Sequence, residues 1–205
     1  MRTHLKKNAF SQAVFFLSFP HRIAKNHAIE RTNLAMRTSS AELPPELSQR
    51  EQPVVALAGM PNVGKSTVFN ALTGLRQHTG NWPGKTVAAA RGDLTYGGER
   101  FTLVDLPGTY SLFPNSAEEE IARDYLCSGE AEAVLILADA TCLERSLNLV
   151  LQTLEAADVP AGVRVNLLDE AAKKGIVLDL PALSHALGAP VVGTAASCGE
   201  GLDKL

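Results

Sequence analysis

The residues with the clearest capacity for chemistry form one glycine-rich segment suited to binding phosphate. Residues 59–66 read GMPNVGKS and match the spacing GxxxxGK[ST] in full. The two glycines let backbone N–H groups curl around phosphate oxygens, and the N-terminus of a following helix adds positive potential. Lys65 is expected to reach the β- and γ-phosphates, and the Ser66 hydroxyl to ligate Mg²⁺, which prefers oxygen ligands. The segment predicts a nucleotide phosphate site, whose expected members are Gly59, Pro61, Asn62, Val63, Gly64, Lys65, Ser66 and Thr67.

A second short pattern concerns the choice of base. Residues 166–169 read NLLD, which matches NxxD, and follow the apolar run 163–165. The Asp169 carboxylate can accept hydrogen bonds from the ring N–H and the exocyclic amine of guanine, and adenine offers no such pair of donors. The tetrapeptide is common, and its other reading is a surface turn that caps the next helix; its place after a strand favours guanine. A backbone N–H after the last apolar run can meet the guanine oxygen. The residues expected to bind the base of GTP or GDP are Asn166, Asp169, Ala195 and Ala196.

Two further segments are placed to respond to the γ-phosphate. Residues 105–108 read DLPG and match DxxG, in which Asp105 is expected to hold Mg²⁺ through water and the Gly108 N–H to contact the γ-phosphate. Thr86, in the segment 81–86 (NWPGKT), is the predicted threonine that closes over Mg²⁺; its other reading is a strand-edge residue. These residues predict a pair of nucleotide-dependent switches.

The residue that follows DLPG is unusual for such a site. Thr109 stands where Ras-type enzymes have a glutamine that orients water, and threonine is too short to copy that reach. Either hydrolysis is slow or another charge stabilises the transition state. Trp82 lies in the Gly/Pro-rich loop before Thr86, which favours a mobile switch residue over a core residue.

The elements that must position these residues follow from apolar runs that alternate with helix-like segments. This alternation predicts an α/β fold with a mostly parallel six-stranded sheet flanked by helices, as in Ras-like P-loop GTPases. The expected strands are 54–58, 88–96, 100–104, 134–138, 163–165 and 190–192. The expected helices are 65–73, 143–154 and 180–187. The sequence ends at Leu205, where such a domain begins its last helix, so we expect a domain truncated before that helix.

Charge divides the chain into two parts. Residues 1–52 carry eight Lys or Arg against four Asp or Glu, and residues 53–205 carry eleven against eighteen. The acidic balance of 53–205 argues against a nucleic-acid partner, because phosphate backbones are bound by clustered basic residues. We expect 1–52 to be a disordered or non-native extension and linker, and 53–205 to be the folded domain. The apolar run 10–19 after basic residues also allows an export signal, or sequence upstream of a start at Met36. The three cysteines show no CxxC pair, and we expect them to be buried.

The motifs together resemble one family, the FeoB ferrous iron transporters of bacteria. The resemblance runs from about Pro53 to Leu205 and is carried by GMPNVGKST, NWPGKTV, DLPGTYSL (105–112), DATCLER (139–145) and NLLDE (166–170). It implies a GTP-binding and GTP-hydrolysing domain that regulates or drives Fe(II) uptake, on the cytoplasmic face of the bacterial inner membrane.

The resemblance also implies a potassium ion beside the phosphates. Asn62 and the backbone carbonyls of Gly80 and Trp82 are its expected ligands, and K⁺ would supply the charge that Thr109 cannot. The residues expected to act in hydrolysis are Lys65, Thr86, Gly108 and Asn62. Further helical and transmembrane regions are the implied partners, and small Feo accessory proteins and a homo-oligomer are also allowed.

Two other functions remain open from the sequence. One is a soluble potassium-dependent GTPase of ribosome assembly or tRNA modification, which would need a basic RNA-binding domain. The other is a non-hydrolysing remnant of a broken gene. Three residues depart from the family pattern: Met60, where little effect is expected, Leu167, which removes packing over the base, and Ala195, which removes a hydroxyl. These departures together predict weak nucleotide binding and fast loss of GDP.

Overall fold

The structure is a computed structural model, and it describes residues 52–74, 77–82, 87–96 and 98–194. The strands are β1 (Val54–Gly59), β2 (Gln77–Asn81), β3 (Ala88–Tyr96), β4 (Glu99–Asp105), β5 (Ala133–Asp139), β6 (Ala161–Asn166) and β7 (Val191–Gly193). The helices are α3 (Lys65–Thr73), α4 (Ala117–Ser128), α5 (Leu143–Ala156), α6 (Leu168–Lys173) and α7 (Leu180–Leu187), with a 3-10 turn, η2 (Ala140–Cys142). The expected extension 1–51, Thr86, Ala195, Ala196, Cys198 and the closing segment lie outside the described residues.

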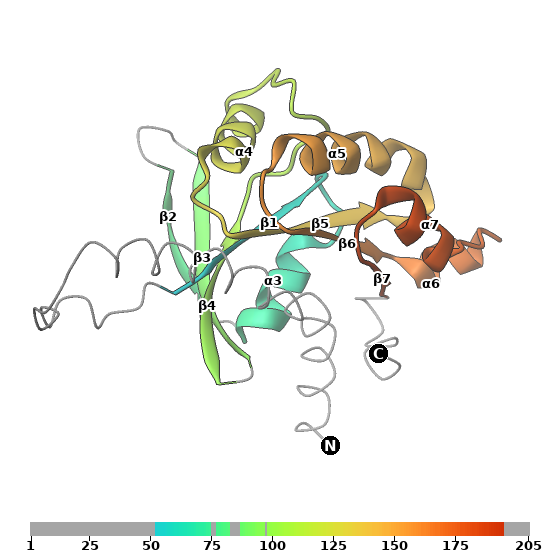
Figure 1. The fold of residues 1–205 in the computed structure, drawn as a ribbon, viewed down its shortest axis with the longest axis horizontal. Coiled ribbons are helices and arrows are strands. Elements are labelled where there is room, and N and C mark those ends of the chain that lie inside the picture. Colours follow the sequence, from blue (N-terminus) through green and yellow to red (C-terminus); the bar gives the residue numbers. More distant parts are fainter. Residues whose placement is uncertain (1–51, 75–76, 83–86, 97, 195–205) are drawn as a thin grey trace, which may run out of the picture.

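The described strands form one sheet in the order β2-β3-β4-β1-β5-β6-β7 (Figure 1). β4, β1, β5, β6 and β7 run parallel, and β2 and β3 are antiparallel to their neighbours. The carboxyl ends of β1, β4 and β6 therefore meet at one edge of the sheet, where open α/β sheets bind their ligands. This edge brings together the three motifs predicted from the sequence.

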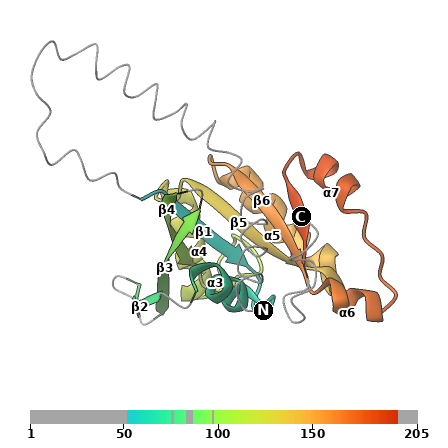
Figure 2. The ribbon, with the colours of Figure 1, turned by 90° about the horizontal axis from the view of Figure 1, so that it is seen from below.

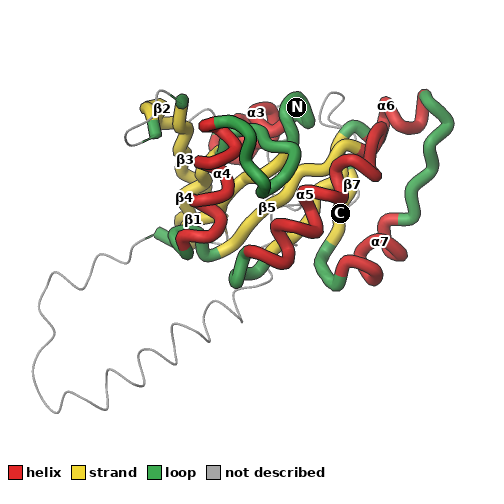
Figure 3. Tube along the Cα trace, turned by 90° about the horizontal axis from the view of Figure 1, so that it is seen from above, coloured by secondary structure: helices red, strands yellow, loops and turns green. Residues whose placement is uncertain are grey.

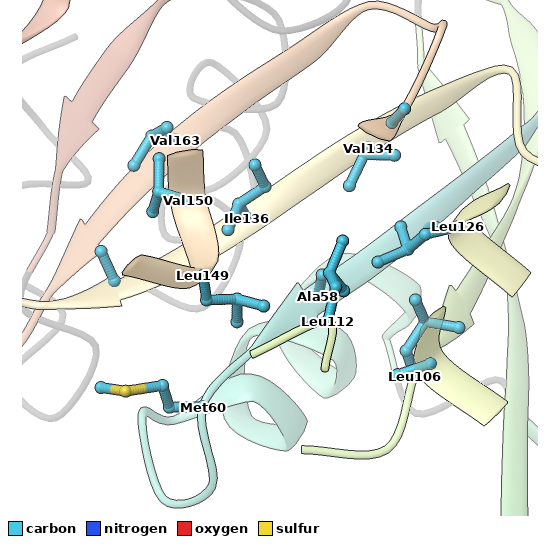
Figure 4. Close-up of a cluster of buried hydrophobic side chains, with 14 of the residues drawn as sticks. Ala58, Met60, Leu106, Leu112, Leu126, Val134, Ile136, Leu149, Val150 and Val163 are labelled. Carbon is cyan, nitrogen blue, oxygen red and sulfur yellow. The ribbon is translucent and has the colours of Figure 1, made fainter. Parts of the chain in front are cut away.

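Helices cover both faces of the sheet. Figure 3 shows α4 and α5 lying over one face, and Figure 2, from the opposite side, shows α3 on the other. Successive side chains of β1 point to opposite faces of the sheet. Ala56 and Ala58 pack in the core under α4 and α5, and Leu57 packs in the core under α3. In Figure 4, Val134 and Ile136 of β5 lie in the same cluster as Leu149 and Val150 of α5. Both cores hold the central strands rigid beneath the motif-bearing loops.

Several predicted elements are confirmed almost to the residue. α3 begins at Lys65 and ends at Gly74, which adopts a φ of 61° as a C-cap. The hairpin of β3 and β4 pairs Tyr96 with Glu99 across the predicted glycine turn. The Asp179 side chain caps α7 by accepting a hydrogen bond from the Ala182 N–H at 2.9 Å.

Three expectations are wrong. The sheet has seven strands among the described residues rather than six, because Gln77–Asn81 pairs with Ala88–Gly92 as an added edge strand. Trp82, expected to be a mobile switch residue rather than a core residue, belongs to the buried core: it is 8% exposed, and its ring packs edge-on against the Tyr125 ring of α4 at 5.2 Å. Cys127 and Cys142 are exposed rather than buried. In the part of the chain that the structure describes, no helix has the length and apolar character to cross a membrane.

Candidate functional site

The turn after β1 has the backbone geometry of a phosphate loop. Asn62 and Gly64 adopt positive φ angles of 64° and 85°, which turn successive N–H groups toward one point. Gly64 is obligatory, because a Cβ there would lie 2.6 Å from Asn166 Nδ2. Gly59 is also confined, though less so, because an added Cβ would lie 3.0 Å from the Leu137 carbonyl oxygen. The loop ends at the N-terminus of α3, where Ser66 and Thr67 are exposed.

Two charged residues of the predicted site contact each other directly. Lys65 Nζ donates a hydrogen bond to Asp105 Oδ1 at 2.6 Å, and the side chains are 12% and 13% exposed. Burial raises the pKa of Asp105 above its ordinary value, and the Lys65 ammonium opposes that rise. Lys65 and Asp105, which the motifs predict to bind phosphate and Mg²⁺, are therefore adjacent, and in this state their charges neutralise each other.

The base-reading segment is tied to the phosphate loop by a buried amide. Asn166 is 0% exposed, and its Nδ2 donates a hydrogen bond to the Val63 carbonyl at 2.8 Å. Its Oδ1 accepts a hydrogen bond from Thr194 Oγ1 at 3.1 Å. The Leu168 N–H donates to the Thr194 carbonyl at 3.3 Å, so α6, whose second residue is Asp169, begins next to the end of β7. Asn166 thus positions the segment that carries Asp169, the residue predicted from the sequence to read the base.

The DLPG segment approaches the phosphate loop closely. A Cβ on Gly108 would lie 3.0 Å from the backbone of Pro61, and the Thr109 N–H donates to the Gly59 carbonyl at 3.2 Å. The Thr109 side chain is 1% exposed, and its Oγ1 donates to the Ser111 carbonyl at 2.6 Å. Thr109 is therefore held by its own loop, which agrees with the prediction that it cannot orient water.

Two side chains that the sequence analysis did not single out hold this loop to the helices. Glu119 of α4 accepts hydrogen bonds from the Tyr110 N–H (3.3 Å) and the Asn115 N–H (2.9 Å), and its Oε1 lies 3.3 Å from the Thr109 hydroxyl, whose proton it shares with the closer Ser111 carbonyl. Gln152 of α5 accepts one from the Leu112 N–H at 2.6 Å. A sequence signal existed for Glu119, since Ser116 accepts from its N–H in the Ser-x-x-Glu spacing of a helix start.

The structure also places three further residues of the motif-bearing segments, of which Met60 and Leu167 depart from the family pattern. Met60 is 4% exposed and packs in the core under α5, with its sulfur 4.0 Å from Ser146 Oγ, so its side chain does not face the loop's concave side. Leu167 adopts a φ of 63° at the start of α6. Tyr110, beside Thr109, lies 4.2 Å under the Arg145 guanidinium of α5.

Acidification should weaken the loop that Glu119 holds. The hydrogen bond from the Asn115 N–H is the main cause of a lowered Glu119 pKa. A carboxyl group with a lowered pKa in the folded state stabilises it above the unfolded pKa, and this contribution is lost as pH falls through the folded pKa. We expect Glu119→Gln to lower the free energy of unfolding at pH 7 by roughly 0.2–1 kcal/mol, because solvent screens this largely exposed carboxylate, and the difference should shrink as the pH falls below the unfolded pKa.

Denaturant unfolding across pH 3–7 measures this effect. Glu118→Gln is the matched control, because Glu118 shares the first turn of α4 but is exposed and makes none of these bonds. Equal losses in both variants, or a loss in Glu119→Gln that does not change with pH, would contradict the role of Glu119.

The fold and the phosphate loop define the class: a Ras-like P-loop GTPase domain. The family model for ferrous iron transport protein B matches residues 53–205. Fe(2+) transporter FeoB of Salmonella typhimurium is 45% identical over 155 residues, which are 74% of this chain and 20% of the relative. The chain belongs to the ferrous iron transport protein B family, and it spans about a fifth of the length of the curated relatives that it matches.

Solved structures of the same family support this assignment. The G domain of T. maritima FeoB is 47% identical, with a TM-score of 0.68 over 75% of this chain and 94% of that one. The cytosolic domain of T. maritima FeoB in its GMPPNP form is 48% identical, with a TM-score of 0.70 over 75% of this chain and 60% of that one. The alternative of a GTPase of ribosome assembly or tRNA modification is therefore not supported.

Proposed function

We propose that this chain binds GTP and GDP, with the phosphates in the loop 59–67 and the base read by Asp169. The observation that carries the proposal is the 2.8 Å hydrogen bond from Asn166 to Val63, which sets the base-reading segment against the phosphate loop. The related T. maritima domain has structures in GDP and GMPPNP forms, which favours the same ligand class here.

The residues of the site suit Mg²⁺ together with the phosphates. Ser66 and Asp105 offer hydroxyl and carboxylate oxygens, which are the ligands that Mg²⁺ prefers. Mg²⁺ would neutralise charge on the phosphate oxygens. In this proposal Lys65 would bind the phosphates, and Ser66, Asp105 and Thr86 would hold the Mg²⁺ ion. The Gly108 N–H, beside Pro61, donates to the γ-phosphate.

GTP hydrolysis is the reaction that this arrangement supports, and it is expected to be slow and potassium-stimulated. Thr109 is held by Ser111 and Glu119, so the DLPG loop supplies no side chain there to orient water. Asn62 is exposed at the rim of the phosphate loop in a left-handed conformation, where its side-chain oxygen is free to ligate a cation. A monovalent cation held by Asn62 and the carbonyls of Gly80 and Trp82 would offset developing negative charge.

Hydrolysis in KCl and in NaCl tests this proposal. We expect GTP turnover to be about tenfold to a hundredfold faster in KCl, and Asn62→Ala to remove the difference while GDP binding persists. Asn70→Ala serves as the control, because Asn70 lies on α3 beyond the phosphate loop. Equal rates in the two salts would refute the potassium site, and no turnover in either would favour a non-hydrolysing remnant.

The wider role follows from the family. We propose that this domain regulates or drives Fe(II) uptake from the cytoplasmic face of the bacterial inner membrane, joined to helical and transmembrane regions of the whole transporter. Small Feo accessory proteins and a second copy of the chain are further partners in this proposal. Iron uptake by cells that carry a full-length transporter with this domain, and with Lys65 replaced, tests it; uptake unchanged by the substitution would contradict it.

A further inference from the structure

A buried guanidinium lies beneath the base-reading segment. Arg164 belongs to the middle of β6 between the core residues Val163 and Val165, and it is 7% exposed. Burial lowers its pKa to about 10. Among the residues that the structure describes, its one hydrogen bond runs from Nε to Thr194 Oγ1 at 2.8 Å, and no carboxylate forms an ion pair with it. A charge buried without a counter-ion destabilises a fold, so its position calls for another explanation.

The hydrogen bond from Arg164 determines which group donates and which accepts in the hydrogen bonds that link Thr194, Asn166 and Val63. A guanidinium group only donates hydrogen bonds, so Thr194 Oγ1 must accept one from Arg164. The Thr194 hydroxyl then donates its own proton to a different acceptor. That proton goes to Asn166 Oδ1 at 3.1 Å. With its oxygen engaged there, the Asn166 amide presents Nδ2 to the Val63 carbonyl at 2.8 Å. A flipped amide would set its oxygen against that carbonyl.

We infer that Arg164 is a positioning residue of the nucleotide site, which acts through Thr194 to fix the orientation of the Asn166 amide against the phosphate loop. The inference rests on the proposed binding of guanine nucleotide. Thr194 also accepts the Leu168 N–H through its backbone carbonyl, so the same residue supports the start of the helix that carries Asp169. Arg164 thereby joins the base-reading segment and the phosphate loop into one preorganised unit.

Positioning and fold stabilisation make opposite predictions for Arg164→Met. Methionine keeps most of the side-chain volume and removes an unpaired buried charge, so we expect unfolding in denaturant to need as much urea as the wild-type chain, or more. The affinity for fluorescent GDP should fall about fivefold to fiftyfold, mainly through faster release. Arg100→Met is the matched control: it makes the same charge change on the exposed β3–β4 hairpin and should leave GDP affinity unchanged.

Thr194 provides a second test that does not depend on the arginine variant. Thr194→Val removes the hydroxyl at constant shape and should lose as much GDP affinity as Arg164→Met, and Thr194→Ser should retain most of it. The double variant Arg164→Met/Thr194→Val should be no weaker than Thr194→Val alone, because either change breaks the same path. If the losses of GDP affinity add in the double variant, or if the variants lose stability in parallel with GDP affinity, the inference is overturned.

A spectroscopic readout separates this inference from the proposed function. The Asn166 side-chain amide resonances, assigned by their absence in Asn166→Asp, should shift and exchange faster with solvent in Thr194→Val without any nucleotide. If the wild-type chain fails to bind GDP but these resonances respond, the proposed function fails and the hydrogen-bond path stands. If GDP binds and the resonances do not respond to Thr194→Val or Arg164→Met, the path is wrong.

Discussion

Replacing Asp169 by asparagine should lower the affinity for GDP about a thousandfold or more and create affinity for xanthosine diphosphate. The carboxylate accepts from two guanine donors, and an amide in its place would set N–H groups against one of them. Xanthine carries a carbonyl where guanine carries its exocyclic amine, so the amide of the variant can donate to it. The segment itself should persist, because Leu168 and Asn166 hold it through Thr194 and Val63.

Equilibrium competition against a fluorescent guanine nucleotide measures both the expected loss of GDP affinity and the expected gain of affinity for xanthosine diphosphate. Glu170→Gln is the matched control, since Glu170 is the next carboxylate in the first turn of α6 and is exposed. GDP affinity that survives in Asp169→Asn would show that Asp169 does not read the base. A loss of GDP binding without a gain of xanthosine diphosphate would point to a structural role for this carboxylate.

Replacing Lys65 by methionine should slow GTP hydrolysis at least a hundredfold, to order of magnitude, because it removes a positive charge from the phosphates where negative charge develops. Single-turnover hydrolysis with the variant in excess over GTP measures this loss. Lys173→Met, at the exposed end of α6, is the matched control. A rate within a few-fold of wild type would contradict the assignment of Lys65.

The same substitution should change how stability depends on pH. Burial already raises the pKa of Asp105, and without the Lys65 ammonium that pKa should rise further. A carboxyl group whose folded pKa exceeds its unfolded value destabilises the fold as pH rises through the unfolded pKa. Lys65→Met should therefore lose about 1–3 kcal/mol of unfolding free energy at pH 7 relative to the wild-type chain, and much less at pH 4.

The sequence predicts the centre of the fold better than its edges. β1, α3 and the β3–β4 hairpin carry regular apolar spacing and glycine boundaries, so local rules suffice for them. β2 reads QHTGN and has no apolar alternation; it is a strand because it pairs with β3. Trp82 was misplaced for a related reason, since its burial depends on Tyr125 of α4, a helix not among those expected from the sequence.

In the candidate site, as in the fold, local sequence rules predict some features and tertiary contacts determine the others. Spacing alone predicts roles for Lys65, Asp105 and Asp169, because phosphate, metal and base chemistry restrict the residue types at these positions. The bonds that hold them in place arise from tertiary contacts. Arg164 reads as one polar interruption in an apolar strand, and among the described residues its partner is Thr194, which directly follows β7.

Displacement of fluorescent GDP from the wild-type chain by unlabelled GDP and by ADP tests the central claim most directly. If Asp169 reads guanine beside the loop 59–67, GDP should displace the probe at concentrations at least about a hundredfold lower than ADP does. Displacement by ADP at equal or lower concentrations would contradict the proposed function and the roles assigned to Asp169 and Asn166.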